Sequence, residues 1–214
     1  MSGRRVKVVA AVVLLCLLGG CVDVTMTTTV DNEGEIEQVR AEAEMSQEVY
    51  ALALEDATSS GYESVGEQFA DELETNEDGF SDVEYEDRRE NGTVVVELIA
   101  QKVTVEEVSY ITTRVTENET VAFTASISDD VTDLNGYTYR VEMPGEITET
   151  DATEIENGNV AVWELHKTNP DRVSVESEVE DRSWLGTIAL VLGVIGVAMV
   201  SVAAYQKRVW ESYV

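Results

Sequence analysis

Few residues in this chain have the types and spacing that catalysis or metal binding requires. His166 is the only histidine among 214 residues, and it lies on a predicted strand next to Lys167. A metal site built on His and Cys, or a Ser-His-Asp arrangement, needs partners that cannot easily be assembled around this histidine. We therefore interpret His166 as a solvent-facing residue near the end of a strand.

The other chemistry-bearing patterns do not indicate an enzyme either. No glycine-rich phosphate loop is present, and 43 acidic residues supply carboxylate pairs so freely that no single pair is informative. Asp133, Asn135 and Glu142 match positions of a calcium-binding EF-hand loop, but its first position is Val131 and no flanking helices are predicted. The sequence predicts a protein that is not an enzyme, with no catalytic residue, no metal and no cofactor.

The cysteine with the clearest chemical context is Cys21. Basic residues precede an uncharged apolar run from Val8, which is too short to cross a bilayer but suits a signal peptide. The run ends in Leu18-Gly19-Gly20-Cys21, which resembles the lipobox of lipoprotein signal peptides. The resemblance implies that residues 1–20 are removed, Cys16 with them, and that the sulfur of Cys21 carries a lipid. The alternative is a structural cysteine in an uncleaved anchor.

A second membrane signal lies near the C-terminus. Residues 183–206 contain no charge and are long enough to cross the hydrocarbon as one helix. Basic residues follow directly, so the positive-inside rule places the tail, 207–214, in the cytoplasm and the main domain outside the cell. Within the segment, Ala189, Gly193 and Gly196 lie on or near one helix face, as in closely packed membrane helices. These features predict a single-pass protein of the cell membrane with an additional N-terminal lipid anchor.

The domain between these two segments is strongly acidic. The span from Val22 to Arg182 holds 42 acidic and nine basic residues, which gives it a formal net charge of −33. Such a surface repels phosphate, so nucleic acid is excluded as a partner. The like charge opposes compaction, whereas molar salt shortens the Debye length to about 3 Å and removes most of that penalty. The composition favours a halophilic source and is similar to that of haloarchaeal exported proteins; the alternative is an acidic secreted protein of a mesophile.

Two periodicities divide the domain, residues 21–182. Alternating side chains predict a hairpin around the turn Asp31–Gly34, and apolar residues at helical spacing then predict two helices, the second capped by Ser60 and Glu63. Further strands are predicted on both sides of Asn91-Gly92 and through the second half. This order predicts an α+β fold, with an antiparallel sheet packed on a helix pair, plus one C-terminal transmembrane helix.

Two sequons for N-glycosylation lie on predicted turns. They are Asn91-Gly92-Thr93 and Asn118-Glu119-Thr120. On an exported domain both turns would be accessible, so Asn91 and Asn118 are candidate glycosylation sites. Because the motif is short and chance matches are frequent, their occupancy stays open.

One passage resembles a known family. In Tyr137–Leu165 a predicted strand ends in Met143-Pro144-Gly145, a variable turn follows, and the outgoing strand carries Trp163. This arrangement resembles the LppM-type lipoprotein domain, and the order of lipobox, hairpin, helix pair and strands is similar along most of the chain. The resemblance implies an envelope lipoprotein whose domain binds envelope lipids or glycolipids. Physically, we expect Pro144 and Gly145 to end one strand and redirect the chain, and Trp163 to fill the core.

These observations together predict a membrane-anchored surface lipoprotein whose exterior domain binds envelope lipids or glycolipids. The expected partners are membrane lipids, an envelope glycolipid or another membrane protein. The alternative function is a non-catalytic accessory or scaffold subunit of a membrane protein complex, because the small-residue helix face and the acidic domain could both contact such a partner.

Overall fold

The computed structural model describes residues 22–77, 79–105, 108–116, 120–127, 136–168 and 170–179. All of them belong to one compact unit, which ends at Val179. The described residues form eleven strands and three helices. In chain order these are β1 (Val22–Val30), β2 (Ile36–Ser46), α2 (Gln47–Ser59), α3 (Val65–Asn76), β3 (Val83–Glu90), β4 (Thr93–Val103), β5 (Ile111–Val115), β6 (Thr120–Ser126), β7 (Gly136–Glu142), β8 (Ile147–Thr150), β9 (Glu154–Glu156), β10 (Val160–Glu164), α5 (Leu165–Thr168) and β11 (Arg172–Glu178).

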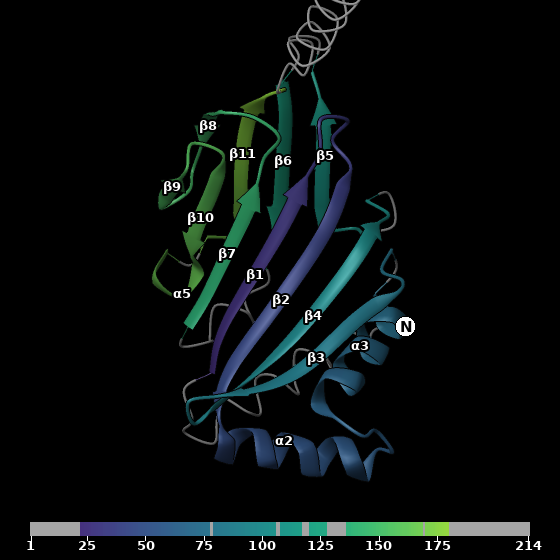
Figure 1. Ribbon diagram of the computed structural model, residues 1–214. Coiled ribbons are helices and arrows are strands. Elements are labelled where there is room, and N and C mark those ends of the chain that lie inside the picture. The colour runs from purple at the N-terminus through teal and green to yellow at the C-terminus, as the bar shows by residue number, and fades with distance from the viewer. Residues whose placement is uncertain are drawn as a thin grey trace, which may run out of the picture. The chain divides into compact units, whose positions relative to one another are not determined.

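The strands form two sheets (Figure 1). Sheet A has seven strands in the order β3-β4-β2-β1-β7-β10-β9, and sheet B has four in the order β5-β6-β11-β8. The predicted first hairpin is confirmed, because β1 pairs with β2 in antiparallel register from Val22 opposite Met45. The pair β1 and β7 is parallel, which brings the second half of the chain alongside the first strand.

The predicted fold class was wrong. Instead of an α+β fold with one antiparallel sheet on a helix pair, the described residues form a mostly β fold with two sheets and short helices. None of the helices in this described part is long and apolar enough to cross a membrane. The segment 183–206 lies outside the described residues. Alternation of apolar side chains identifies a strand but not the sheet that it joins, so the division into two sheets could not be read from the pattern.

One face of sheet A is buried by different elements along its length. Where sheet B covers it, Tyr139 lies between Phe123 and Trp163, with ring centroids 6.4 Å and 6.1 Å away. Where the helices cover it, a second cluster consists of Val22, Met45, Val49, Tyr50, Ala53, Val65, Val94 and Val96. Burial of these apolar side chains is the main stabilising contribution that joins the layers.

The second helix begins one turn later than predicted. The hydroxyl of Ser64 accepts a hydrogen bond from the backbone N–H of Glu67 at 3.0 Å, and the Glu67 carboxylate accepts one from the N–H of Glu63. Ser60, the predicted cap, instead ends α2. The capping chemistry was correctly expected, but another serine provides it.

Both helices are held to the sheet by Asp87 on β3. One carboxylate oxygen accepts a hydrogen bond from the Tyr50 hydroxyl at 2.6 Å, and the other accepts one from the N–H of Gly66 at 3.1 Å. A Cβ atom on Gly66 would lie 2.3 Å from that second oxygen, so the contact requires glycine. Asp87 thereby links α2, the start of α3 and β3.

Candidate functional site

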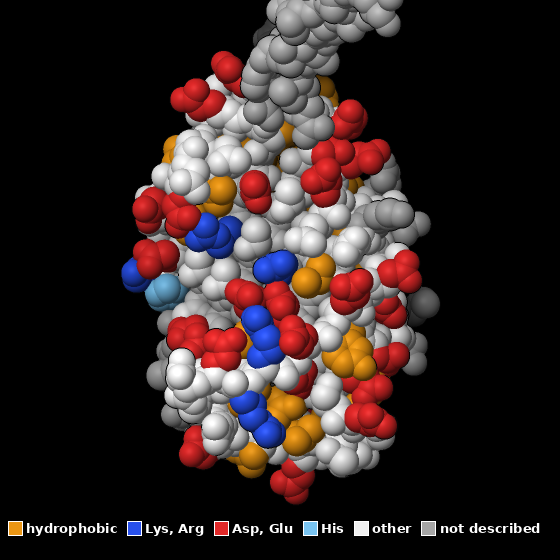
Figure 2. Space-filling view, viewed as in Figure 1, with side chains coloured by type: hydrophobic (Ala, Val, Ile, Leu, Met, Phe, Trp, Pro, Cys, Tyr) orange, Lys and Arg blue, Asp and Glu red, His pale blue; other side chains and the backbone are white. Residues whose placement is uncertain are grey.

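The second face of sheet A is open and polar. Figure 2, drawn from the same side as Figure 1, shows Lys and Arg side chains in the middle of this face with acidic side chains around them. The strand register places on it the arginines Arg40, Arg88 and Arg140 and the threonines Thr25, Thr27 and Thr29. We call this surface the open face.

The arginines of the open face neutralise carboxylates. Glu97 is only 7% exposed, and burying an unpaired carboxylate would cost several kcal/mol. Its two oxygens lie 3.2 Å from Arg40 Nη1 and 3.7 Å from Arg88 Nη2. Arg88 also lies 3.8 Å from a carboxylate oxygen of Glu42. The network is therefore a ladder of paired charges across β2, β3 and β4.

Arg140 continues this pairing on the other side of β1. Thr27 lies opposite both Arg40 on β2 and Arg140 on β7. The Arg140 guanidinium donates two hydrogen bonds to the Glu156 carboxylate, one of them at 3.1 Å, and this contact lowers the pKa of Glu156. The middle of the open face thus presents charge-paired donors and acceptors with threonine hydroxyls between them.

A hollow of about 250 Å³ lies at the β3–β4 side of the open face. Its lining consists of Glu84, Tyr85, Glu86, Glu97 and Ile99. Three glutamates share this lining with Ile99 and the exposed Tyr85, and the apolar surface in so small a hollow is limited. An acyl chain would gain little hydrophobic stabilisation there, because that gain is proportional to the apolar area removed from water.

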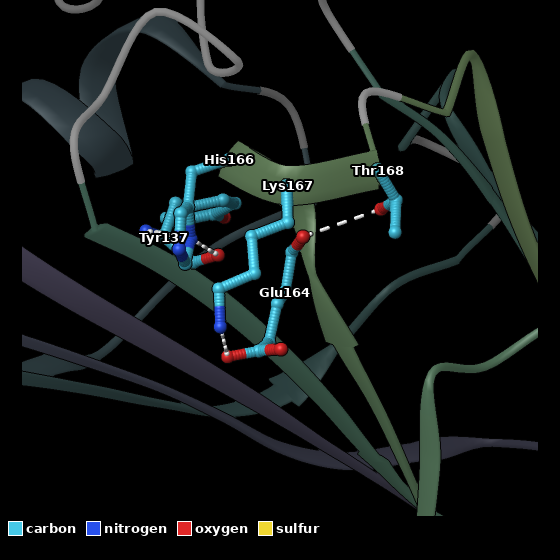
Figure 3. Close-up of polar contacts among 5 residues, drawn as sticks. All are labelled: Tyr137, Glu164, His166, Lys167 and Thr168. Atoms are coloured by element: carbon cyan, nitrogen blue, oxygen red, sulfur yellow. Dashed lines mark hydrogen bonds and ion pairs between the residues drawn. The ribbon is translucent and has the colours of Figure 1, made fainter.

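His166 lies in the short helix α5 and not on a strand as predicted (Figure 3). It is half-buried, and its Nδ1 atom lies 3.4 Å from both the backbone N and O of Tyr137. Lys167 pairs with the carboxylate of Glu164, and the Thr168 hydroxyl donates to the Glu164 backbone carbonyl. These contacts attach α5 to β7 and β10, so the residues that make them have a structural role.

The Pro-Gly motif lies where the chain passes from one sheet to the other. Pro144 and Gly145 separate β7 in sheet A from β8 in sheet B. The left-handed backbone of this region occurs farther along, at Asn157 (φ 54°) and Gly158 (φ 84°) between β9 and β10. The chain thus passes from sheet A to sheet B at Pro144-Gly145, and Asn157-Gly158 forms the turn of the β9–β10 hairpin.

Trp163 lies in the core on β10, only 1% exposed. Its indole N–H donates a 2.9 Å hydrogen bond to Asp151, and the same oxygen of Asp151 accepts one from the N–H of Ser174. Sequence reasoning missed Asp151, because its partners are 12 and 23 residues away and one acid among 43 carries no signal. Asp151 joins the β8–β9 turn to both sheets.

Of the other predicted site residues, the structure describes only Asn91. It is exposed in the β3–β4 turn, with a positive φ of 46° followed by 95° at Gly92. The remaining predictions, for Cys21, Asn118, Ala189, Gly193 and Gly196, lie outside the described residues. Within the described ranges, no group of three or more His, Cys, Asp or Glu side chains is arranged to hold a metal ion.

The described unit begins and finishes at opposite ends of the sheets. Val22 starts β1, whose other end pairs with the end of β7 through Thr29 and Glu142. The last strand, β11, finishes beside Glu146, just after that end of β7, with its Glu178 N–H bonded to the Glu146 carbonyl at 3.0 Å. The strand length between these ends is about 26 Å, for eight steps of about 3.3 Å.

We expect the domain to lose stability in alkali. Burial raises the pKa of Tyr110 to about 12, and burial together with the hydrogen bond to Asp87 raises that of Tyr50 to about 12. A raised pKa in the folded state means that the stabilisation is complete below pH about 10 and is lost as the pH rises toward 12. Equilibrium unfolding followed by circular dichroism between these pH values should show the decline, and Tyr110→Phe should reduce it. An unchanged unfolding free energy up to pH 12 would contradict the burial of these phenols.

No family model matches the chain, and no curated protein matches it. Among solved structures, the NMR structure of the folded domain of LppM from Mycobacterium tuberculosis is similar, with a TM-score of 0.40 and 13% sequence identity. The match covers 76% of this chain and 92% of that chain. The family resemblance predicted from Tyr137–Leu165 is thus supported only as a distant likeness of fold.

Proposed function

We propose that this chain is a surface lipoprotein that is held at a membrane by a lipid on Cys21 and displays residues 22–179 as a non-catalytic binding module. One observation supports this attachment. Strand β1, a central strand of sheet A, starts at Val22, directly after the lipobox cysteine. Removal of residues 1–20 would therefore leave every described strand and helix in the chain. The lipid would be joined to it without a linker.

We further propose that the module binds the polar part of envelope lipids or glycolipids. The core beneath sheet A is filled by large side chains, including Phe123, Tyr139 and Trp163, which supports recognition of a headgroup over an acyl chain. The open face offers arginine–carboxylate pairs and threonine hydroxyls, which can donate and accept hydrogen bonds at once. Hydroxyl-rich headgroups have the matching chemistry.

The test is to purify the full-length lipidated protein in mild detergent at molar salt and incubate it with native lipid extract. Mass spectrometry of the repurified protein should find bound lipids of one headgroup class, and the water-soluble headgroup should compete for binding. Arg140→Gln, which removes only the pair with the more exposed Glu156, should weaken retention without changing the circular dichroism spectrum. Protein that carries no lipid beyond its covalent anchor would count against this function.

The alternative is an accessory subunit of a membrane complex. It is favoured by the same open face, because a broad polar surface with paired charges also suits a protein partner. Crosslinking in membranes, followed by purification in mild detergent, separates the two proposals. A stoichiometric protein partner in place of bound lipid would support the accessory role.

A further inference from the structure

One cross-strand row of sheet A connects the start of β1 with the edge strand β3. Val22 lies opposite Met45, Met45 opposite Val94, and Val94 opposite Arg89. Neighbouring strands are about 4.8 Å apart, so Arg89 lies about 14 Å from Val22 along this row. The Asn91-Gly92 turn follows two residues later at the same end of the sheet, and α2 also begins there, at Gln47 directly after β2 (Figure 1). We call this region, from Val22 to the Asn91-Gly92 turn, the Val22 end.

The attachment point can lie only a short way from this surface. Consecutive Cα atoms are 3.80 Å apart, so a lipid on Cys21 would be joined about one such spacing from Val22. The start of α2 and the Asn91-Gly92 turn both lie at this end of the sheet. With the acyl chains in the bilayer, they would therefore be the parts of the domain nearest to the lipid headgroups.

The opposite end of sheet A is distant from the attachment point. The turn between β1 and β2 lies beyond Val30, about 26 Å from Val22 along the strand. Both ends are acidic, because this turn carries Asp31, Glu33 and Glu35, and α2 at the Val22 end carries exposed Glu48, Glu55 and Asp56. Distance from Cys21, and not charge, therefore distinguishes the two ends.

We propose that the Val22 end of sheet A faces the bilayer surface, with α2 and the Asn91-Gly92 turn nearest to the lipid headgroups and the Asp31–Glu35 turn directed away. This inference rests on the proposed lipidation of Cys21. The partner that the Val22 end contacts is the membrane in which the lipid anchor is embedded. Because no linker separates Cys21 from β1, the domain has little freedom to turn this end away.

The orientation has a consequence for the sequon at Asn91. A glycan on this side chain would need the space between the turn and the headgroups. We therefore expect Asn91 to be unmodified in the lipidated protein, although its turn is exposed in the domain itself. Peptide mapping that finds a glycan on Asn91 of the lipidated chain would overturn the proposed orientation.

The direct test compares one label position at each end. Glu90 and Glu33 are both exposed, and Glu90→Cys and Glu33→Cys are matched substitutions beside the two turns. In the proposed mature protein Cys16 is removed and the Cys21 sulfur is blocked, so each variant has a single thiol for a fluorophore. The lipidated full-length variants are reconstituted in phosphatidylcholine vesicles that contain a headgroup-quencher lipid, at molar salt.

The label at position 90 should be quenched several-fold more than the label at position 33. Equal quenching at both positions would mean that the domain lies flat, and weak quenching at both would mean that it stands free of the surface. Either result would overturn this proposal while leaving lipidation intact. Intact-mass analysis of the same samples shows the lipid separately; if it is absent, the proposed function and this inference fall together.

Discussion

Replacing Trp163 with alanine is expected to lower the free energy of unfolding by about 3–5 kcal/mol, the range measured for large aromatic side chains in protein cores. Trp163 is 1% exposed and packs against the tilted ring of Tyr139, so its removal leaves a large cavity where the two sheets meet. Denaturant unfolding at fixed molar salt, followed by circular dichroism, measures the change. A loss below about 1 kcal/mol would mean that the side chain is not in the core.

Two matched variants separate packing from hydrogen bonding at this position. Asp151→Ala leaves the buried indole N–H without its acceptor, which should cost about 1–3 kcal/mol. Trp163→Phe removes the donor and keeps an aromatic ring, so it should cost less than Trp163→Ala. If Asp151→Ala were neutral, the bond between Asp151 and Trp163 would not contribute to stability.

Transfer from molar salt to about 0.1 M salt is expected to unfold the domain, because the Debye length then grows from about 3 Å to about 10 Å. The span from Val22 to Arg182 has a formal net charge of −33, and many of its carboxylates are exposed with few basic residues near them. Self-repulsion of this size opposes the compact state once it is no longer screened. Thermal unfolding over a series of KCl concentrations should show a midpoint that rises steeply with salt.

The control for this prediction reduces charge without altering the core. Glu33, Glu35 and Glu37 are exposed at one end of sheet A, and their joint replacement by glutamine should lower the salt concentration required for folding. Sucrose at equal osmolality should not substitute for KCl. If the domain stays folded at 0.1 M salt, the protein is an ordinary acidic protein. The argument for a halophilic source then no longer holds.

Local features of the fold were predictable because local chemistry determines them. The hairpin of β1 and β2 follows from alternation and a polar turn, and the turn between β3 and β4 follows from Asn91-Gly92, whose backbone has positive φ at both residues. The two longer helices were predicted from helical spacing, although Ser64 and not Ser60 starts the second. In each case the relevant contacts lie within a few residues.

The arrangement of the sheets was not predictable in this way. The parallel pairing of β1 with β7 joins residues more than 110 positions apart, and nothing in either strand specifies that partner. Glu97 and Asp151 illustrate the same point for single residues, because their roles come from cross-strand neighbours. The order of the predicted elements, a strand pair, a helix pair and then further strands, led to a single-sheet α+β prediction, which the two sheets contradict.

The positions of the two ends of the domain also bear on the two predicted membrane segments. The sequence alone suggested that both ends of the domain are attached to the same surface. Val22 and Val179 instead lie at opposite ends of the described unit, so only one of them can rest on a bilayer when the strands stand upright. The proposed orientation assigns that place to Val22, and the paired labels at positions 90 and 33 decide it.

The proposed membrane attachment requires Cys21 to be the lipidated first residue of the mature protein. Intact-mass spectrometry of the protein extracted from membranes of a halophilic expression host tests it most directly. We expect a chain that begins at Cys21 and carries the added mass of a lipid, and a Cys21→Ser variant without that mass. A chain that retains residues 1–20 with an unmodified Cys21 thiol would contradict it.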